Sequence, residues 1–468
     1  MLSAAMAPDG HFAVAWVDSA YDSTWRPDRS RLDLYIRFFD KDANPLTDAY
    51  KIPKILDTTW VNCHALDMDS AGNTVLVWVE GRTLSNTKLS KLRFISFTPD
   101  GIPAGTPKTL YSDLDLDRPL SVSLSNNGMF AMSFETKLND SSGRWIQRLD
   151  LHGNSLNFPF IAHDTLPDNF PGLYTMAKVA VNESEDVVIT WLHFIESGHN
   201  YPLYQVFDAD DYPMDWAPLG HRVDNADSLA GACSPYPYWL DNDRFVVFWT
   251  DYLAPRPTPN LPWLARVFDD RGLAPQPIRT VMWGDSLHTG SPLTPFSMDI
   301  SSANKFSCTY NRSYWYPIDT LWPQSHSWEH QVGFLGGIVG NEPWRNTTVF
   351  EYSPAYGSDT VWSMIWDSRY SFRLYLQVPA VACSDDRIVW VYTRFQTDTV
   401  FEAYAIVSDW DMGVGVAEPV TPITHLEIAN PIGSSITLRY SNCPNGFRAS
   451  VYDASGRKID IIESSGES

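Results

Sequence analysis

The 468-residue chain carries 34 Lys and Arg against 56 Asp and Glu, a formal net charge of -22 at pH 7. This negative charge repels phosphate backbones and anionic headgroups at long range, which argues against nucleic acids and membrane surfaces as partners. No run of eighteen apolar residues occurs, so no membrane span is predicted. Aromatic residues make up 14% of the chain and charged residues only 19%, a composition typical of a folded, β-rich protein.

One strand pattern recurs seven times from the N-terminus onward. A turn residue is followed at alternate positions by two apolar residues and an aromatic one, as in "DGHFAVAW" (9–16) and "AGNTVLVW" (71–78). The closing aromatic residues are Trp16, Trp78, Phe134, Trp191, Trp249, Tyr310 and Tyr392. Five of the six intervals between them are 56 to 62 residues long, and the sixth is 82. Such regular spacing is the mark of a structural repeat.

A second landmark follows each copy, as in "RFFDKDANPL" (37–46) and "RVFDDRGLAP" (266–275), where an apolar run ends in a turn and restarts. Each unit is therefore expected to hold four antiparallel strands, the pattern of a β-propeller blade. The sequence predicts an all-β fold, with a seven-bladed β-propeller over residues 1–415. The repeated aromatic residues are expected to pack between neighbouring blades.

Cysteines and carboxylates give no complete cofactor motif. The five cysteines lie far apart, which argues against a disulfide framework and a zinc site, and Cys308 is expected to be a small buried apolar residue. Acidic clusters occur at "DKDAN" (40–44), "DLDLD" (113–117) and "DADD" (208–211). Calcium favours such oxygen ligands, but none of the three continues into a full calcium-binding loop, so we interpret them as polar hairpin turns. No cofactor and no metal ligand is assigned.

The sequence also contains no catalytic motif. There is no Gly-x-Ser-x-Gly elbow, and the Asp, Gly and Trp of "DMDSAGNTVLVW" (67–78) have the wrong spacing for a sialidase box. His326 and His330 would share a metal only on a helix, whereas their segment is expected to enter a strand. The position two residues after each repeated aromatic is always polar, and we expect it on a shared rim of the ring. Its seven occupants are Asp18, Glu80, Thr136, His193, Asp251, Arg312 and Arg394.

The long sixth interval is rich in tryptophan. Aromatic side chains beside polar ones are typical of a surface that stacks on sugars. The predicted ligand-binding residues are Trp315, Tyr316, Trp322, Trp328 and Trp344, while Trp362 and Trp366 are expected in a strand core.

The last segment, residues 416–468, differs from the repeats. It begins with a Pro-containing linker and then alternates in "SSITLRY" and "FRASVYDASGRKIDII". "ANPIGSSITLRY" and "ASVYDASGRKI" resemble the Ig-like C-terminal domain of proteins exported by the type IX secretion system. The matching residues are Asn430, Pro431, Tyr452, Asp453, Gly456 and Arg457. The resemblance implies a small, incomplete Ig-like β-sandwich, since the later strands of that family are missing here, and the secretion machinery as a partner.

The repeats themselves resemble, more loosely, units of secreted bacterial propellers of uncharacterised function. Both resemblances imply an extracellular or cell-surface protein, and we expect Met1 to be an internal or artificial start with any leader upstream. The sequence thus predicts a binding module for a glycan or protein ligand, with carbohydrate recognised through the aromatic-rich loop. The alternative is an extracellular polysaccharide hydrolase or lyase on the same scaffold. Carboxyl groups or histidines converging at the mouth of the central channel would favour the enzyme, and a mouth without such groups would favour the binding module.

Overall fold

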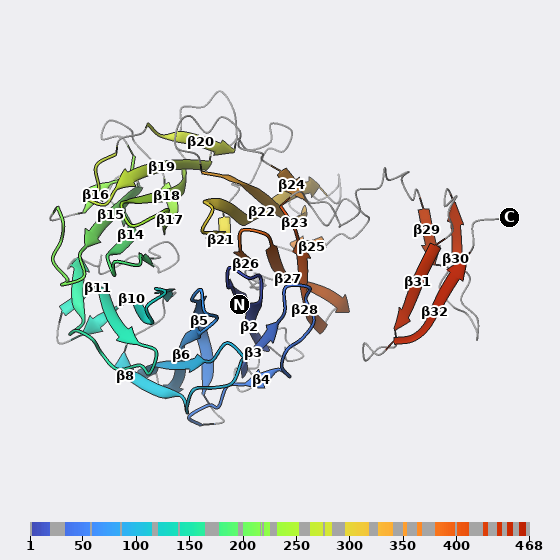
Figure 1. The fold of residues 1–468 in the computed structure, drawn as a ribbon, viewed down its shortest axis with the longest axis horizontal. Coiled ribbons are helices and arrows are strands. Elements are labelled where there is room, and N and C mark those ends of the chain that lie inside the picture. The colour runs from blue at the N-terminus through green and yellow to red at the C-terminus, as the bar shows by residue number, and fades with distance from the viewer. Residues whose placement is uncertain are drawn as a thin grey trace. The chain divides into compact units, whose positions relative to one another are not determined.

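In the computed structural model, the chain divides into two compact units, Met1–Met412 and Gly413–Ser468, shown as a ribbon in Figure 1. The described residues contain strands, turns and bends but no helix, so the fold is all-β, and none of them forms a segment able to cross a membrane as a helix. The structure describes residues 2–18, 33–56, 59–84, 87–114, 120–138, 141–163, 177–194, 200–215, 217, 220–224, 232–251, 263–274, 277–282, 295–317, 326–339, 350–352, 363–366, 380–397, 400–410, 425–428, 438–441, 447–452 and 458–464.

The described part of the first unit forms seven antiparallel sheets, numbered here in chain order, and neighbouring strands in each sheet follow one another along the chain. Sheets 1 and 2 contain β1 (Leu2–Met6), β2 (Phe12–Asp18), β3 (Asp33–Phe39) and β4 (Tyr50–Lys51), then β5 (Trp60–Met68), β6 (Thr74–Leu84), β7 (Thr87–Phe97) and β8 (Lys108–Leu114). Sheets 3 and 4 contain β9 (Ser121–Leu124), β10 (Met129–Leu138), β11 (Ser141–Asp150) and β12 (Phe160–His163), then β13 (Lys178–Val181), β14 (Val187–Phe194), β15 (Asn200–Phe207) and β16 (His221–Arg222).

Sheet 5 contains β17 (Ala232–Trp239), β18 (Arg244–Asp251), β19 (Trp263–Asp269) and β20 (Arg279–Met282). Sheet 6 contains β21 (Pro295–Ile300), β22 (Lys305–Pro317), β23 (His326–Ile338) and β24 (Phe350–Tyr352), with β25 (Ser363–Trp366) also paired to β23. Sheet 7 has three strands within the described residues, β26 (Ala380–Cys383), β27 (Ile388–Thr397) and β28 (Val400–Ser408).

The seven sheets contact one another in a closed cycle. The first strand of each sheet lies against the first strand of the next, in the order β1, β5, β9, β13, β17, β21 and β26, and β26 lies against β1. In Figure 1 these strands surround a common centre, and the N-terminus lies near it. Side chains from distant parts of the chain therefore meet at the centre of this unit.

Trp16, Trp78, Phe134, Trp191 and Trp249 each pack in an apolar cluster that joins two neighbouring sheets, as predicted, whereas the side chains of Tyr310 and Tyr392 lie outside the described part of the structure. All seven lie on the second strand of a sheet, and Trp78, Trp191 and Trp249 are fully buried. Trp78 belongs to the same apolar cluster as Ile36 and Phe38 of sheet 1, and comparable clusters join sheets 2 to 5 and sheets 7 and 1. A large flat ring at this position buries the face of one sheet against its neighbour. Cys308 is buried in the cluster between sheets 5 and 6, also as predicted.

The turn residue of the repeat has a conformational role. Gly10, Gly72 and Gly128 have φ angles of 90°, 88° and 84°, and Glu185 and Asn304 occupy the equivalent slot at 67° and 59°. This left-handed region favours glycine, which explains why glycine opens three copies of the template. In each sheet, the turn between the third and fourth strands lies at the same end as the turn between the first and second strands, because alternate connections of an antiparallel meander lie at the same end of the strands. We call this end the short-turn face and the opposite end the long-loop face.

The described residues of the second unit form two antiparallel strand pairs. β29 (His425–Ile428) pairs with β30 (Leu438–Ser441), and β31 (Phe447–Tyr452) pairs with β32 (Lys458–Ser464). The Tyr-Asp-x-x-Gly-Arg motif thus begins at the end of β31, and Asp453, Gly456 and Arg457 lie outside the described residues, as do Asn430 and Pro431.

Candidate functional site

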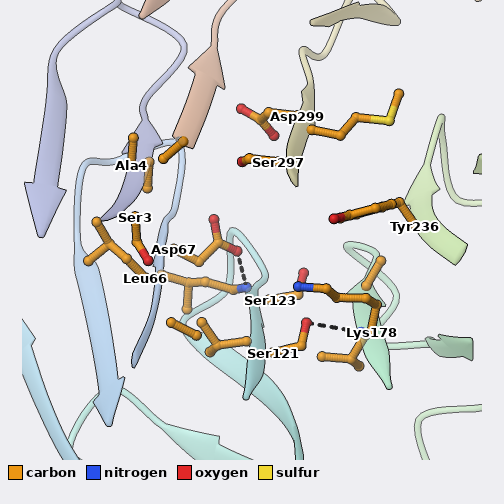
Figure 2. A pocket seen from close by; sticks show the side chains of 18 of the residues that line it. Ser3, Ala4, Leu66, Asp67, Ser121, Ser123, Lys178, Tyr236, Ser297 and Asp299 are labelled. Atoms are coloured by element: carbon orange, nitrogen blue, oxygen red, sulfur yellow. Dashed lines mark hydrogen bonds between the residues drawn. The ribbon is translucent and has the colours of Figure 1, made fainter. Parts of the chain in front are cut away.

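A cavity of about 400 Å³ lies where the seven first strands meet, and residues from all seven line it. Its volume falls within the range of small-ligand pockets. Figure 2 shows the cavity from close by, with acidic, basic, hydroxyl and aromatic side chains of several sheets around one space. This is the candidate functional site.

The repeat determines which residues line the cavity. Each first strand ends at a residue that opens the tight turn: Ala7, Asp69, Ser125, Asn182, Leu240, Ser301 and Ser384. Side chains two and four positions earlier share one face of the strand. The deep layer, nearer the short-turn face, consists of the residues two positions before the turn: Ala5, Asp67, Ser123, Ala180, Tyr238, Asp299 and Ala382. The outer layer consists of the residues four positions before it: Ser3, Ala65, Ser121, Lys178, Tyr236, Ser297 and Ala380.

Several of these polar side chains also join neighbouring sheets. The first strand of each sheet is an edge strand, so its outward N–H groups need acceptors from elsewhere. Asp67 Oδ2 accepts a hydrogen bond from Leu124 N at 2.7 Å, and Asp299 Oδ2 accepts the equivalent bond from Cys383 N at 2.7 Å. Serine hydroxyls accept the corresponding bonds at Ser121, Ser123 and Ser297, at 3.1 to 3.2 Å. Closure of the cycle therefore accounts for part of the polar lining.

Burial changes the acidity of the two carboxyl groups. The pKa of Asp67 is raised to about 7, mainly by desolvation and to a smaller extent by the charge of Asp299, although backbone N–H groups of Leu124 and Met68 act against the shift. Desolvation likewise raises the pKa of Asp299 to about 7. A carboxyl group that titrates near neutral pH can donate a hydrogen bond as well as accept one. The deep layer thus carries two acids that can bind hydroxyl groups in either state.

The outer layer carries a lysine. Desolvation lowers the pKa of Lys178 to about 8, and its Nζ lies 5.4 Å from the centroid of the Tyr236 ring. Figure 2 shows the Lys178 side chain directed into the cavity from β13. The site therefore combines a cation, an aromatic ring and two carboxyl groups, which together can orient a polar ligand.

The predicted aromatic site lies on sheet 6, at the ends of its two longest strands. Trp315 and Tyr316 are on β22, and Trp328 on β23 lies directly opposite Trp315 in the antiparallel register. β21 pairs with β22 only as far as Tyr310, so these residues lie beyond the first strand of the sheet. The structure therefore brings the Trp315 and Trp328 backbones together, while Trp322 and Trp344 lie outside the described residues.

The expected polar rim is wrong for two of its members. Glu80 and Thr136 are buried, because β6 and β10 continue past them. Glu80 accepts a hydrogen bond from Ile55 N and pairs with the Arg93 guanidinium, both at 2.7 Å. His193 is half-buried, and desolvation lowers its pKa.

The acidic clusters and the histidine pair considered as metal ligands lie partly within the described residues. Asp40 Oδ1 accepts hydrogen bonds from the backbone of its own turn, and Asp208 does the same. These bonds fit the interpretation as polar turns, whereas Asp115 and Asp117 lie outside the described residues. His326 and His330 both belong to strand β23. Within the described part of the chain, no three His, Cys, Asp or Glu side chains are placed to hold a metal ion.

Sequence reasoning missed Asp67, Lys178 and Asp299. A signal for them exists, because each is a charged residue of a first strand, two positions before the turn for Asp67 and Asp299 and four positions before it for Lys178. Asp67 precedes Gly72 by the same number of residues as Asp299 precedes Asn304. Charged residues at equivalent repeat positions predict a shared interior surface.

No family model and no curated protein matches this chain. Among solved structures, the chain is similar to a protein of unknown function from Dyadobacter fermentans, with TM-score 0.41 and 11% identity over 75% of this chain and 95% of that one. An α-L-arabinofuranosidase of Fusarium graminearum in complex with arabinobiose gives TM-score 0.39 and 10% identity, over 74% and 92%. An ulvan lyase gives TM-score 0.43 and 9% identity, over 87% and 93%. The neighbours thus include carbohydrate-active enzymes, and at these scores they assign no activity to this chain.

Proposed function

We propose that residues 1–412 form a seven-bladed β-propeller that binds carbohydrate in its axial cavity. The cyclic contacts of the seven first strands support the propeller. The observation that carries the binding function is the cavity lining, where Asp67, Asp299 and Lys178 stand beside serine hydroxyls and the Tyr236 ring. Hydroxyl-rich ligands need closely spaced donors and acceptors together with an apolar ring face, and this lining supplies both.

The sheet 6 hairpin is proposed as a second contact for a longer glycan. Trp315 and Trp328 occupy opposite positions where the hairpin extends beyond β21. Aromatic residues at such a position offer stacking surfaces to sugar rings.

A glycan array tests the proposal. The purified chain is screened beside Ser3→Phe, which places a ring in the cavity, and Ser3→Ala, which changes the same residue without filling it. Binding by the wild type and Ser3→Ala, but not by Ser3→Phe, supports the axial site. Screening Trp315→Ala and Trp322→Ala tests the hairpin, and loss of binding only in these two variants would move the site from the cavity to sheet 6. No binding by the wild type would contradict the carbohydrate function.

The two acids favour glycoside hydrolysis as a second candidate. Asp67 and Asp299 face one cavity, and a pKa of about 7 suits a general acid at neutral pH. Release of reducing ends from a bound glycan, abolished in Asp67→Asn and in Asp299→Asn, would establish the enzyme. Stable binding of the glycan without release of reducing ends would contradict the enzyme and support the binding module.

We also propose that the second unit is an Ig-like sorting-type domain and that the chain is extracellular. The pairing of β31 with β32 on either side of the Tyr-Asp-x-x-Gly-Arg motif supports the comparison with that family. Expression of the chain behind an added signal peptide in a bacterium with a type IX secretion system, followed by fractionation, tests both points. Detection of the chain only inside the cells would contradict them.

A further inference from the structure

Lys178 is the one basic residue of the cavity layers defined above. No carboxylate of the described residues pairs with it, and desolvation alone accounts for its lowered pKa. A desolvated ammonium is unfavourable until an anion neutralises it. With a pKa of about 8 it still carries its proton at neutral pH. The outer layer thus offers a preformed site for one negative charge.

The two acids lie at a different depth. Asp67 and Asp299 precede their turns by two residues, whereas Lys178 precedes its turn by four. Two residues along a strand span about 6.6 Å. No ion pair of the described residues joins Lys178 to either acid, so the cation and the acids can act as separate recognition points. A ligand of the cavity therefore meets a positive group at one level and hydrogen-bonding carboxyl groups one step deeper.

We propose that the cavity selects an acidic saccharide unit over a neutral one, with the anionic group on Lys178 and ring hydroxyls on Asp67 and Asp299. This inference rests on the proposed carbohydrate-binding function. The dimensions suit a single sugar, whose anionic substituent and far hydroxyls are separated by a distance similar to that between the two layers. The Tyr236 ring beside Lys178 supplies the apolar surface for the sugar face.

A neutral sugar would be bound less tightly for a physical reason. It would displace water from Lys178 without supplying a counter-charge, whereas a carboxylate or sulfate ester would replace that water with a charge-assisted hydrogen bond. The preference is expected to be tenfold or more. Carboxylate and sulfate ester share the required charge, and separate probes distinguish them.

Dissociation constants measured by NMR titration test the inference. The probes are D-glucuronate, D-glucose 6-sulfate and D-glucose, and the proteins are the wild type, Lys178→Met, Lys178→Arg and Lys41→Met. Lys41→Met removes the same charge from an exposed turn and serves as the matched control. We expect the wild type and Lys41→Met to bind at least one anionic probe tenfold more tightly than glucose. Lys178→Met is expected to lose this preference and keep its affinity for glucose within twofold, and Lys178→Arg to retain most of it.

The failures of the two proposals are distinguishable. Equal binding of glucose and both anionic probes by the wild type overturns the selectivity and leaves carbohydrate binding intact. A preference that survives in Lys178→Met also overturns it. Failure of all three probes to bind the wild type, combined with an empty glycan array, overturns both proposals. Thermal unfolding of each variant identifies any that does not fold, and Lys178→Gln then replaces Lys178→Met.

Discussion

The Asp67 carboxylate on β5 accepts a 2.7 Å hydrogen bond from the Leu124 N–H on β9, and so joins sheet 2 to sheet 3. Asp299 makes the equivalent bond to Cys383 between sheets 6 and 7. The same two side chains border the cavity. Their contributions to stability and to binding can be separated. Substitution by leucine removes both the hydrogen-bond acceptor and the charge, whereas substitution by asparagine removes the charge and keeps an acceptor oxygen.

Asp67→Leu is expected to destabilise the fold by about 1–3 kcal/mol, because the Leu124 N–H loses its acceptor in a buried position. Asp67→Asn retains an acceptor oxygen of the same shape and is expected to change the free energy of unfolding by less than about 1 kcal/mol at about pH 4, where the Asp67 carboxyl of the folded protein is protonated. Urea denaturation of both variants measures the difference. Equal stability of the two would show that the inter-sheet hydrogen bond contributes little.

The raised pKa values of Asp67 and Asp299 predict a pH-dependent stability. The pKa values of Asp67 and Asp299 rise from 3.8 in the unfolded chain to about 7 in the folded protein, so the folded state binds more protons in this window. Their contribution to the free energy of unfolding therefore falls as pH rises from 3.8 to about 7 and is constant above that. Burial lowers the pKa of His64 from 6.5 to about 3, which acts in the opposite direction over an overlapping window.

The double variant Asp67→Asn/Asp299→Asn isolates the contribution of the acids, since His64 is common to both proteins. Its stability relative to the wild type is expected to increase as pH rises from about 4 to about 7. Urea denaturation at several pH values measures this difference. A difference that stays constant with pH would contradict the raised pKa values of Asp67 and Asp299.

A buried ion pair in sheet 3 predicts a large effect of a small substitution. Arg144 Nε lies 2.9 Å from Glu135 Oε1, both side chains are almost completely buried, and the guanidinium stacks over the Trp191 ring of sheet 4 at 5.9 Å. Glu135→Gln removes the negative charge beside a buried cation and is expected to cost about 3 kcal/mol. The control is Asp42→Asn, which neutralises the carboxylate of the exposed Asp42–Arg387 pair at 3.8 Å and is expected to cost less than about 0.5 kcal/mol. Similar losses in both variants would contradict this assignment.

A turn glycine provides a test of backbone strain. Gly72 has a φ of 88°, and a Cβ there would lie 2.4 Å from His11 Nε2 of sheet 1. Gly72→Ala is therefore expected to lower the melting temperature clearly, through both strain and the displaced imidazole. Gly105→Ala, where a Cβ meets no atom within 4 Å, is the matched control and is expected to be neutral. Equal melting temperatures would show that the turn tolerates a side chain.

The strands could be predicted from the sequence because alternation and turn chemistry are local signals. The spacing of the repeat alone predicts that Trp78 and Trp191 pack between sheets, and both are fully buried. The cavity could not be predicted in the same way, because Asp67, Lys178 and Asp299 meet only when sheets distant in the chain close into a cycle. The predicted position of Glu80 on a polar rim is wrong for a related reason. The repeat pattern ends at the aromatic residue and does not show that β6 continues beyond it as far as Leu84.

The most direct test of the axial site is a crystal structure of the chain soaked with a glycan that binds on the array. We expect electron density for a sugar between Lys178 of the outer layer and Asp67 and Asp299 of the deep layer. Sugar density only at the sheet 6 hairpin, with the axial cavity holding water alone, would contradict it.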